Sequence, residues 1–372
     1  MVSRRNFIKM AGVAAALTVF PGCGSDAAKS KGEKGNDKMK DKVAGADGDK
    51  YVPYDKREGK ESVVFFTRDL SAAGLLKIFD RVKENLSGKV AIKLHTGEPH
   101  GPNIIPRPWV KELIGKKLQN SAIVETNTYY KGARFTTEDH RKTLETNGWT
   151  FAKVDIIDET GTAKLPVKNG KWFTEMSVGK TLLNYDSFLA LTHFKGHTMG
   201  GFGGSDKNIG IGCADGRDGK KWIHSHEGEG QWSVDKEELM ERISESTKSV
   251  VDHFKDKIAF INVMRNMSVS CDCEGTGAQP VVTPDVGIVA SLDILATDQA
   301  SVDLIYALPE ESRHDFVERM ETRHGLRQLS YMKELGMGND KYKLIDIDND
   351  DKVITAKEAV AGINGKWASD GQ

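Results

Sequence analysis

The sequence predicts an α/β domain: a mostly parallel sheet with helices on both faces, in a single large domain. From about residue 61 onward, short apolar runs of strand length alternate with stretches whose apolar residues recur at helical spacing. This alternation is typical of parallel sheets, because parallel strands need crossover connections that are usually helices. At 372 residues the chain is also long enough to bury a substantial core.

The first half of the domain alternates strand and helix. The run SVVFFT has the length and apolarity of a buried strand, and the later AAGLLKIFDRVKENL places apolar residues at helical spacing. A proline at residue 108 suits the first turn of a second helix. In chain order we expect strands at 62–67, 89–95, 121–127 and 152–158, and helices at 72–86, from about 108, and at 136–148.

The second half continues the alternation. The run DSFLALTHF at 186–194 predicts a buried strand that leads directly into a glycine-rich stretch. Further runs predict strands at 258–264, 286–293 and 342–348, and helices at 236–254, 296–307 and about 314–335.

The end of the chain has a partial resemblance to a calcium-binding loop. Asp346, Asp348 and Asp350 stand at the first three ligand spacings of an EF-hand. However, Asp351 and Lys357 occupy the positions at which that loop needs glycine and a bidentate glutamate. We therefore expect a tight turn between two short strands rather than a calcium site.

An export signal precedes the domain. The residues SRRNFIK at 3–9 form a twin-arginine n-region, and the apolar run that follows is too short to cross a bilayer as a mature helix. Cys23 follows Gly22 at the end of this run, as in a lipobox, so we expect Cys23 to carry lipid. The protein is then expected in the periplasm or cell envelope, exported by the twin-arginine route and attached to the membrane by lipid.

Composition divides the chain further. After the signal peptide at 1–23, residues 24–60 are rich in Lys, Asp, Gly, Ser and Ala, and we expect a flexible tether because such a segment buries little apolar surface. The α/β domain is expected at 61–345 and a C-terminal tail at 346–372. The formal net charge is −1, with no long block of like charge, which excludes a nucleic-acid-binding protein.

The strand expected at 186–194 ends in the first candidate site. In open α/β sheets, ligands bind beyond the carboxyl ends of the strands. The side chains with candidate catalytic roles there are His193, Lys195 and His197. The glycine-rich backbone that follows could approach an anionic group closely. The candidate cofactor-binding residues in it are Gly203, Gly204, Lys207 and Asn208.

The cysteines form the second candidate site. Three of them lie beyond Cys23, and an odd number in an exported protein argues against a simple disulfide framework. Thiolates and imidazoles bind iron, zinc and nickel. The candidate metal ligands are Cys213, Cys271, Cys273 and His226, the last in an H-x-H pair with His224. The alternative is a disulfide between Cys271 and Cys273, with Cys213 as a small buried apolar residue.

Two aspartates near residue 295 complete the candidates. Asp298 lies where a helix N-cap is expected, and capping is the default role for such a residue. Asp293 ends the strand expected at 286–293 and has the better claim to the site.

As a linked set, these motifs resemble the family called domain of unknown function 362. The resemblance lies in LTHFKGH at 191–197, GGSDKNIGIGC at 203–213, CDC at 271–273, DVGIVASLD at 285–293 and DQA at 298–300. It implies association with iron–sulfur proteins, because members of this family often carry a ferredoxin-like pair of cluster motifs. This chain lacks C-x-x-C-x-x-C runs, so a cluster would have to use the cysteines of the domain itself.

These observations lead to a functional hypothesis. We expect an exported metal- or iron–sulfur-binding oxidoreductase that acts on a small anionic substrate and exchanges electrons with a redox partner. Its cofactor would be an iron–sulfur cluster or mononuclear iron, with zinc or nickel as alternatives. A non-redox isomerase or hydrolase and a surface-tethered binding protein remain alternatives.

Overall fold

The computed structural model describes residues 48–364, so the export signal, Cys23 and most of the expected tether lie outside the described residues, as do residues 365–372. The strands are β1 Glu61–Thr67, β2 Val90–Lys93, β3 Ser121–Glu125, β4 Val154–Ile156, β5 Thr162–Pro166, β6 Glu175–Gly179, β7 Ser187–His193, β8 Lys195–His197, β9 Gly201–Gly203, β10 Ile258–Met264, β11 Gly287–Ser291, β12 Lys341–Asp346 and β13 Lys352–Ile354.

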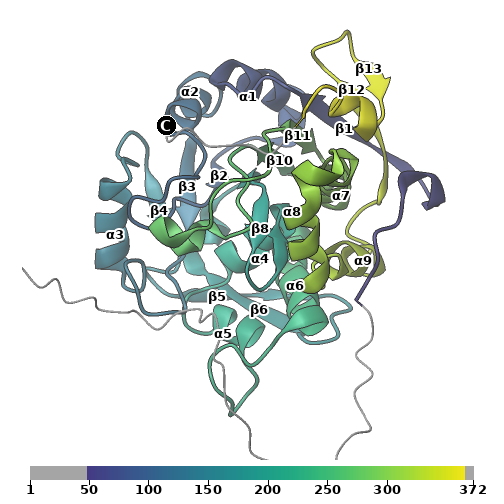
Figure 1. The fold of residues 1–372 in the computed structure, drawn as a ribbon. Helices are drawn as coiled ribbons and strands as arrows, with labels where there is room; N and C mark the ends of the chain where they lie inside the picture. Colours follow the sequence, from purple (N-terminus) through teal and green to yellow (C-terminus); the bar gives the residue numbers. More distant parts are fainter. Residues whose placement is uncertain (1–47, 365–372) are drawn as a thin grey trace, which may run out of the picture. The chain divides into compact units, whose positions relative to one another are not determined.

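Nine of these strands form one sheet in the order β13-β12-β1-β11-β10-β7-β2-β3-β4 (Figure 1). The run β10-β7-β2-β3-β4 is parallel throughout, and β12 pairs in parallel with β1. The antiparallel pairs are β1 with β11, β10 with β11, and β12 with β13. The expected mostly parallel sheet is confirmed.

Helices cover both faces of this sheet. They are α1 Ala72–Phe79, α2 Arg107–Lys117, α3 Thr137–Thr146, α4 Ser205–Cys213, α5 Gly219–His224, α6 Lys236–Phe254, α7 Ile294–Ala307, α8 Glu310–Thr322, α9 Arg327–Glu334 and α10 Ala356–Ala359. Short 3-10 helices lie at η1 Tyr54–Lys56, η2 Lys83–Asn85, η3 Lys180–Asn184 and η4 Asp272–Gly277.

Strand β7 shows why the sheet is buried on both sides. Successive residues of a strand point to opposite faces. Leu189 and Leu191 pack into the apolar cluster formed with α1, α2 and α3, whereas Phe188 and Ala190 pack into the cluster formed with α4, α6 and α7. All seven residues of β7 are buried, so a continuous apolar run rather than an alternating one specifies this central strand.

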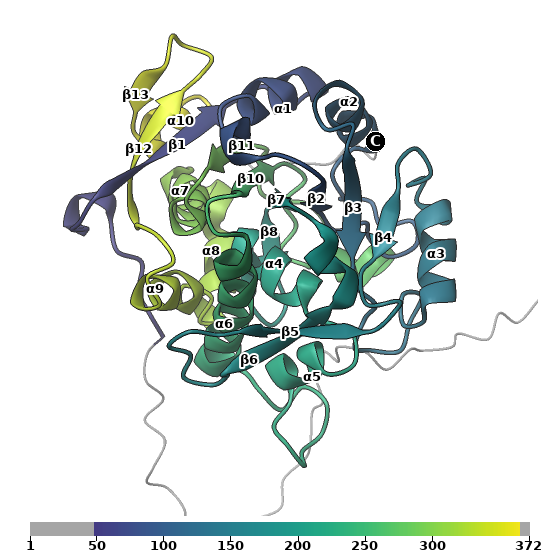
Figure 2. The same cartoon turned by 180° about the vertical axis from the view of Figure 1, so that it is seen from behind.

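Two small hairpins lie outside the main sheet. Strands β5 and β6 pair antiparallel and lie against α5 and α6, as both views show (Figures 1 and 2). Strands β8 and β9 pair antiparallel directly after β7. The second hairpin turns the chain after His193 back over the sheet edge, and in this way it positions Lys195 and His197.

The N-terminal boundary expected at residue 61 is too late. Residues from 48 onward pack on the domain: the ring of Tyr51 stacks on Tyr306 with centroids 3.8 Å apart. The guanidinium of Arg57 forms a buried bidentate pair with Asp303, with both N–O distances at 2.6 Å. The polar composition of this segment hid two anchoring side chains whose partners lie far along the chain.

The C-terminal segment is also part of the domain rather than a tail. Strand β12 joins the main sheet beside β1 and ends at Asp346, and β13 returns antiparallel after a turn that contains Asp348 and Asp350. The expected turn between two short strands is confirmed. Asp348 accepts hydrogen bonds from Thr67 Oγ1 at 2.7 Å and from Lys77 Nζ at 2.8 Å, so its carboxylate fastens the turn to the domain.

Two segments differ in secondary structure from what the sequence predicts. The helix expected over 314–335 is divided into α8 and α9, because His324 adopts a positive φ of 56° and Gly325 packs against the backbone of Gly200 and Gly201. The stretch from residue 205 to 213, expected as a flexible loop, is helix α4. Its glycines suggested a loop, but tertiary packing favours the helix: Gly210 lies so close to α6 that a Cβ there would meet the Ile243 carbonyl oxygen at 2.5 Å.

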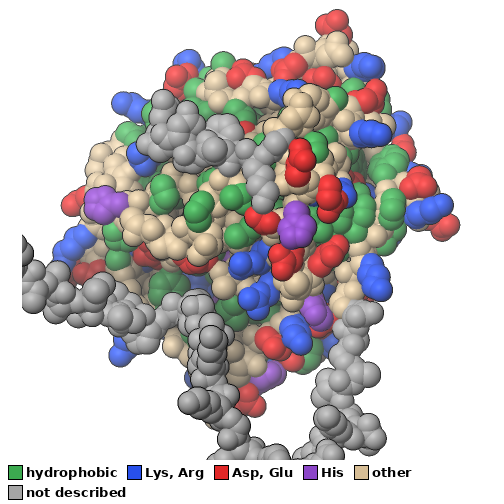
Figure 3. Space-filling model, viewed as in Figure 1, with side chains coloured by type: hydrophobic (Ala, Val, Ile, Leu, Met, Phe, Trp, Pro, Cys, Tyr) green, Lys and Arg blue, Asp and Glu red, His purple; other side chains and the backbone are tan. Residues whose placement is uncertain are grey.

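Two features of the described residues bear on the surroundings of the domain: the apolarity of its helices and the distribution of charge on its surface. None of the helices in residues 48–364 is long and apolar enough to cross a membrane. On the face drawn in Figure 3, acidic and basic side chains are interspersed, without a large area of one sign.

Candidate functional site

The candidate site lies beyond the carboxyl ends of the parallel strands β2, β3, β7 and β10. His193 is the last residue of β7 and pairs in register with Val263 of β10. The chain after β10 passes through residues 265–270 and reaches η4, which has Cys271 as its N-cap and contains Cys273. The sheet therefore brings the residues around 195 and 271 together, as expected for an α/β fold.

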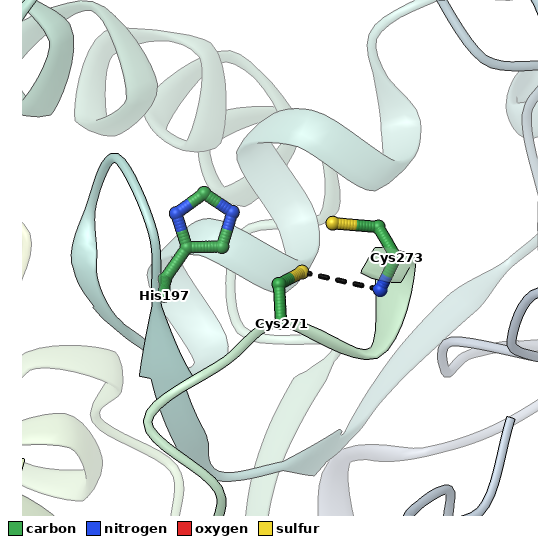
Figure 4. A group of neighbouring side chains, drawn as sticks. All are labelled: His197, Cys271 and Cys273. Atoms are coloured by element: carbon green, nitrogen blue, oxygen red, sulfur yellow. Dashed lines mark hydrogen bonds between the residues drawn. The ribbon is translucent and has the colours of Figure 1, made fainter. Parts of the chain in front are cut away.

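Two cysteines and one histidine converge at this edge. The ligand atoms of His197, Cys271 and Cys273 all lie within 4.8 Å of one another (Figure 4). The backbone N–H of Cys273 donates a hydrogen bond to Cys271 Sγ at 3.4 Å. Cys271 is only 2% exposed, whereas Cys273 is partly exposed. The group is thus nearly enclosed, and Cys273 is the more exposed of its two cysteines.

The two thiols differ in acidity. The hydrogen bond from the Cys273 side chain holds the pKa of Cys271 well below its usual value, although burial opposes this, and Lys207 and His197 add to the lowering. The same hydrogen bond and burial raise the pKa of Cys273 well above its usual value. Cys271 is therefore the more acidic thiol of the pair, and Cys273 is the one that keeps its proton more firmly.

Hydrogen bonds define the tautomer of His197. Its Nδ1 accepts from the backbone N–H groups of Gly200 at 2.8 Å and Met199 at 3.2 Å. Burial and the nearby Lys207 lower the pKa of His197, which favours the neutral ring. The proton then resides on Nε2, the ring nitrogen that faces the two sulfur atoms (Figure 4). In this arrangement the Nε2–H group of His197 points toward the sulfur atoms of Cys271 and Cys273.

Asp272, between the two cysteines, connects them to His193 and Lys195. Its carboxylate lies 2.9 Å from His193 Nδ1 and 3.3 Å from Lys195 Nζ. Burial would raise the pKa of Asp272, but His193 and Lys195 outweigh it and lower that pKa. Nε2 of His193 faces the Arg265 carbonyl oxygen at 2.7 Å. Both nitrogens of His193 are thus engaged, and the ring holds the C-x-C loop in place.

The expected backbone cradle for an anion is filled by the protein itself. Asp298 accepts from the N–H groups of Ser205 at 2.7 Å and Asp206 at 2.9 Å, which are the first amides of α4. A Cβ at Gly204 would meet the Asp298 carboxylate at 2.5 Å. Asp298 therefore caps α4, whereas Asp293 caps α7 by accepting from Ala296 N at 2.9 Å. The side chain of Asp298 thus occupies the space beside Gly204 that the prediction assigned to a ligand.

The remaining residues of that prediction divide into two groups. Asn208 donates to the Lys93 carbonyl oxygen at 3.1 Å and to Thr192 Oγ1 at 3.0 Å, which is a structural role. Lys207, by contrast, makes no ion pair within residues 48–364 and contributes to the lowered pKa of Cys271. A Cβ at Gly203 would meet Lys207 Cδ at 3.3 Å and Lys195 Nζ at 3.6 Å, so the side chains of both lysines pack against this glycine. Lys207 is the cation available to an incoming anion.

Two of the expected metal ligands lie elsewhere. Cys213 is fully buried at the end of α4, and it is absent from the group of metal-ligating atoms found among the described residues. Burial raises the pKa of its thiol to about 12. His226 lies beside Glu238 at 3.7 Å and Arg242 at 3.3 Å, and its partner in the H-x-H pair, His224, stacks near Tyr129. Among the described residues, Cys271 and Cys273 therefore meet His197 rather than Cys213, because Cys213 at the end of α4 packs into the apolar core.

Sequence reasoning missed a buried charged network next to the C-x-C loop. Glu125, at the end of β3, is 2% exposed and pairs with Lys93 Nζ at 2.8 Å. It also accepts from Thr96 N at 2.8 Å and contacts His95 Nδ1 at 3.3 Å. The available signal was the occurrence of Lys93 and Glu125 within otherwise apolar strand runs that end at the same sheet edge.

A neighbouring loop joins this network to the site. Glu98 accepts from Tyr130 Oη at 2.6 Å and from Arg134 Nη2 at 2.8 Å. Glu98 also lies close to η4: a Cβ added to Gly275 would come within 3.0 Å of the Cβ of Glu98. Gly275 adopts a positive φ of 56°, which favours glycine at this close approach.

Stability should depend on pH through a buried carboxylate of α4. Burial raises the pKa of Asp206 to about 7, whereas an unfolded aspartate titrates near 3.9. The folded state then binds the proton more tightly, so its stability increases as the pH falls through about 7 toward about 4. We expect Asp206→Asn to raise the melting temperature more at pH 8 than at pH 5, in calorimetry of both proteins. An equal difference at the two pH values would contradict this prediction.

Comparisons with known proteins place the chain in context. Residues 90–303 match the family described as "Domain of unknown function (DUF362)", and residues 1–21 match the twin-arginine translocation pathway signal sequence. None of the curated proteins matches the chain.

Two solved structures show partial similarity. One is the lactate racemase apoprotein from Thermoanaerobacterium thermosaccharolyticum, at 14% identity and a TM-score of 0.32, covering 57% of this chain and 52% of that one. The other is a protein from Thermotoga maritima, at 14% identity and a TM-score of 0.32, covering 52% of this chain and 49% of that one. The chain thus spans about half the length of each.

Proposed function

The chain belongs to the DUF362 family, and we propose that this member is an exported metal-binding protein with its centre at Cys271, Cys273 and His197. The observation that carries the proposal is the convergence of two sulfur atoms and one imidazole within 4.8 Å. Such a donor set is typical of sites for zinc, iron and other metals that favour sulfur and nitrogen ligands.

The donor set supports a single ion more than an iron–sulfur cluster. Clusters are usually held by four thiolates, and only two cysteines of the described chain meet here because Cys213 lies in the apolar core. Three protein ligands leave a fourth position for water or substrate, which is the pattern of catalytic metal sites. We therefore favour mononuclear iron, with zinc or nickel as alternatives.

Metal uptake should release protons. Cys273 holds a proton in the metal-free protein, and the bonds from Met199 and Gly200 to Nδ1 place another on Nε2 of His197. Thiols must be deprotonated to bind a metal, so the proton of Cys273 competes with the ion and affinity is expected to increase with pH. His197 binds as the neutral ring, so it joins through Nε2 only when the Nε2 proton moves to Nδ1, and the bonds from Met199 and Gly200 must then give way.

A small anion is the substrate class that the surroundings favour. Lys207 has no carboxylate partner within residues 48–364 and lies beside Lys195 near the thiolates. A bound anion would complete the charge balance and lie next to the open coordination position. With iron the centre would support electron exchange and hence an oxidoreductase; with zinc it would act as a Lewis acid in non-redox chemistry.

Metal analysis of the natively exported protein tests the proposal. The protein is purified from the cell envelope under anaerobic, reducing conditions, and its metals and acid-labile sulfide are measured. We expect about one equivalent of a transition metal and no sulfide. Sulfide with several iron atoms would show a cluster instead. Protein that holds no metal and takes up none of the iron, zinc or nickel added after reduction would overturn the proposal.

Lipid attachment is part of the same proposal. Cys23 follows the twin-arginine signal sequence that ends at residue 21, at the position of a lipobox cysteine. The exported protein should then fractionate with membranes, and Cys23→Ser should release it into the soluble fraction. Equal membrane association of both proteins would contradict attachment at this residue.

A further inference from the structure

The two cysteines of the centre are placed to react with each other. Their sulfur atoms lie within 4.8 Å, both thiols are free, and only Asp272 separates them in the chain. The twin-arginine signal directs the protein out of the cytoplasm. Disulfides persist in the oxidising compartments outside it. From this geometry we infer that Cys271 and Cys273 form a reversible dithiol–disulfide couple that reacts with small-molecule disulfides.

Exposure assigns the order of attack. Cys273 is partly exposed, whereas Cys271 is 2% exposed. Cys273 gives its proton to Cys271 Sγ and, as a thiolate, attacks one sulfur of the external disulfide, which forms a mixed disulfide and expels one thiolate. That thiolate takes the proton from Cys271, and Cys271 Sγ then attacks Cys273 Sγ and expels the second thiolate. The two cysteines lose two electrons and the external disulfide gains them.

The surroundings favour reversibility. Asp272, the residue between the two cysteines, is held by His193 at 2.9 Å and by Lys195 at 3.3 Å. The loop that must close is therefore fixed at its middle residue. The sulfur atoms have to approach to about 2.05 Å for the bond to form. A disulfide across a single residue in a fixed loop is strained, and strained disulfides are reduced more easily than ordinary structural ones.

Oxidation also changes what the centre can bind. A disulfide removes both thiolates from the group, which leaves His197 as the only one of the three ligands. This consequence rests on the proposed metal-binding function, whereas the couple itself requires only the two cysteines. The centre would then hold metal when reduced and release it when oxidised.

Peptide mass analysis of the exported protein tests the couple. The protein, stripped of metal, is equilibrated with oxidised or reduced glutathione, alkylated and cleaved with trypsin. Cys271 and Cys273 share the peptide 266–313, and Cys213 lies in the separate peptide 208–217. We expect the first peptide to carry two alkyl groups after reduction and none after oxidation, with a mass two hydrogens lower than that of the unalkylated dithiol. Cys273→Ser should abolish this loss, and Cys213→Ser should leave it unchanged.

The outcomes separate the couple from the metal site. Alkylation of both cysteines after equilibration with oxidised glutathione, or glutathione retained on them as a stable adduct, would overturn the couple even if the reduced protein binds metal. A reversible disulfide in a protein that never binds metal would support the couple and contradict the proposed function. If both hold, the affinity for Zn²⁺ should fall at least about 100-fold on oxidation, since two of three ligands are lost.

Discussion

Glu125→Ala is expected to lower the free energy of unfolding by about 3 to 5 kcal/mol, because it leaves Lys93 as an unpaired buried charge. The Glu125 carboxylate lies 2.8 Å from Lys93 Nζ, and the two side chains are 3% and 2% exposed. Lys93 cannot move easily toward solvent: it lies against Gly212, where an added Cβ would come within 1.9 Å of Lys93 Cε. Urea unfolding followed by circular dichroism measures the loss.

A matched pair of variants isolates the charge. Glu125→Gln keeps the size of the side chain and should still be strongly destabilised, because the buried ammonium of Lys93 loses its counter-ion. Glu159 pairs with Arg141 at the surface, where ion pairs contribute at most about 1 kcal/mol, so Glu159→Ala should have little effect. Losses of similar size at residues 125 and 159 would contradict the role assigned to the buried pair.

Cys271→Ser is expected to weaken binding of Co²⁺ or Zn²⁺ by at least about 100-fold, since a serine hydroxyl does not replace a thiolate ligand. The thiolate form of Cys271 is favoured by the hydrogen bond from Cys273 and by Lys207 and His197, which lower its pKa. Titration of the reduced protein with Co²⁺ gives the affinity and, through charge-transfer absorbance, the number of thiolate ligands. Retention of the full absorbance in Cys271→Ser would contradict the centre.

Cys213→Ser is the control for this experiment. Cys213 is fully buried among apolar residues, and burial raises the pKa of its thiol to about 12, so it stays protonated at neutral pH. The substitution should leave the metal affinity unchanged, and the buried hydroxyl should lower only the stability. Equal loss of affinity in Cys213→Ser and Cys271→Ser would instead support the three-thiolate centre that the sequence suggested.

The regular part of the fold followed from local patterns. Apolar runs of strand length and helical spacing predicted β7, β10 and α6, because burial on a sheet or helix face imposes these periods on the sequence. Helix α4 was missed because its glycines disfavour a helix locally, and its close packing on α6 is a long-range effect. Arg57 was assigned to a tether because its partner Asp303 is 246 residues away.

The site was predicted in part. Cys271, Cys273 and His197 were all named, because sulfur and imidazole side chains are few and chemically distinctive. The spacing of residues in the sequence could not indicate that Cys213 points away from them. Nor could it indicate that Asp298, rather than a ligand, accepts the hydrogen bonds of the first amides of α4. Side-chain direction depends on packing that no short sequence window contains.

The sequence by itself determined the export signal, the alternation of strands and helices and the residue types available for chemistry, because these depend on neighbours within a few positions. Only the tertiary structure decided which reactive residues meet. The parallel order of β10, β7, β2 and β3 brings side chains that are far apart in the sequence to one sheet edge, among them Glu125, His193 and Cys271, the first and last of which are 146 residues apart. Strand order is set by the burial of both sheet faces as a whole, so the metal site and the redox pair are properties of the folded sheet edge.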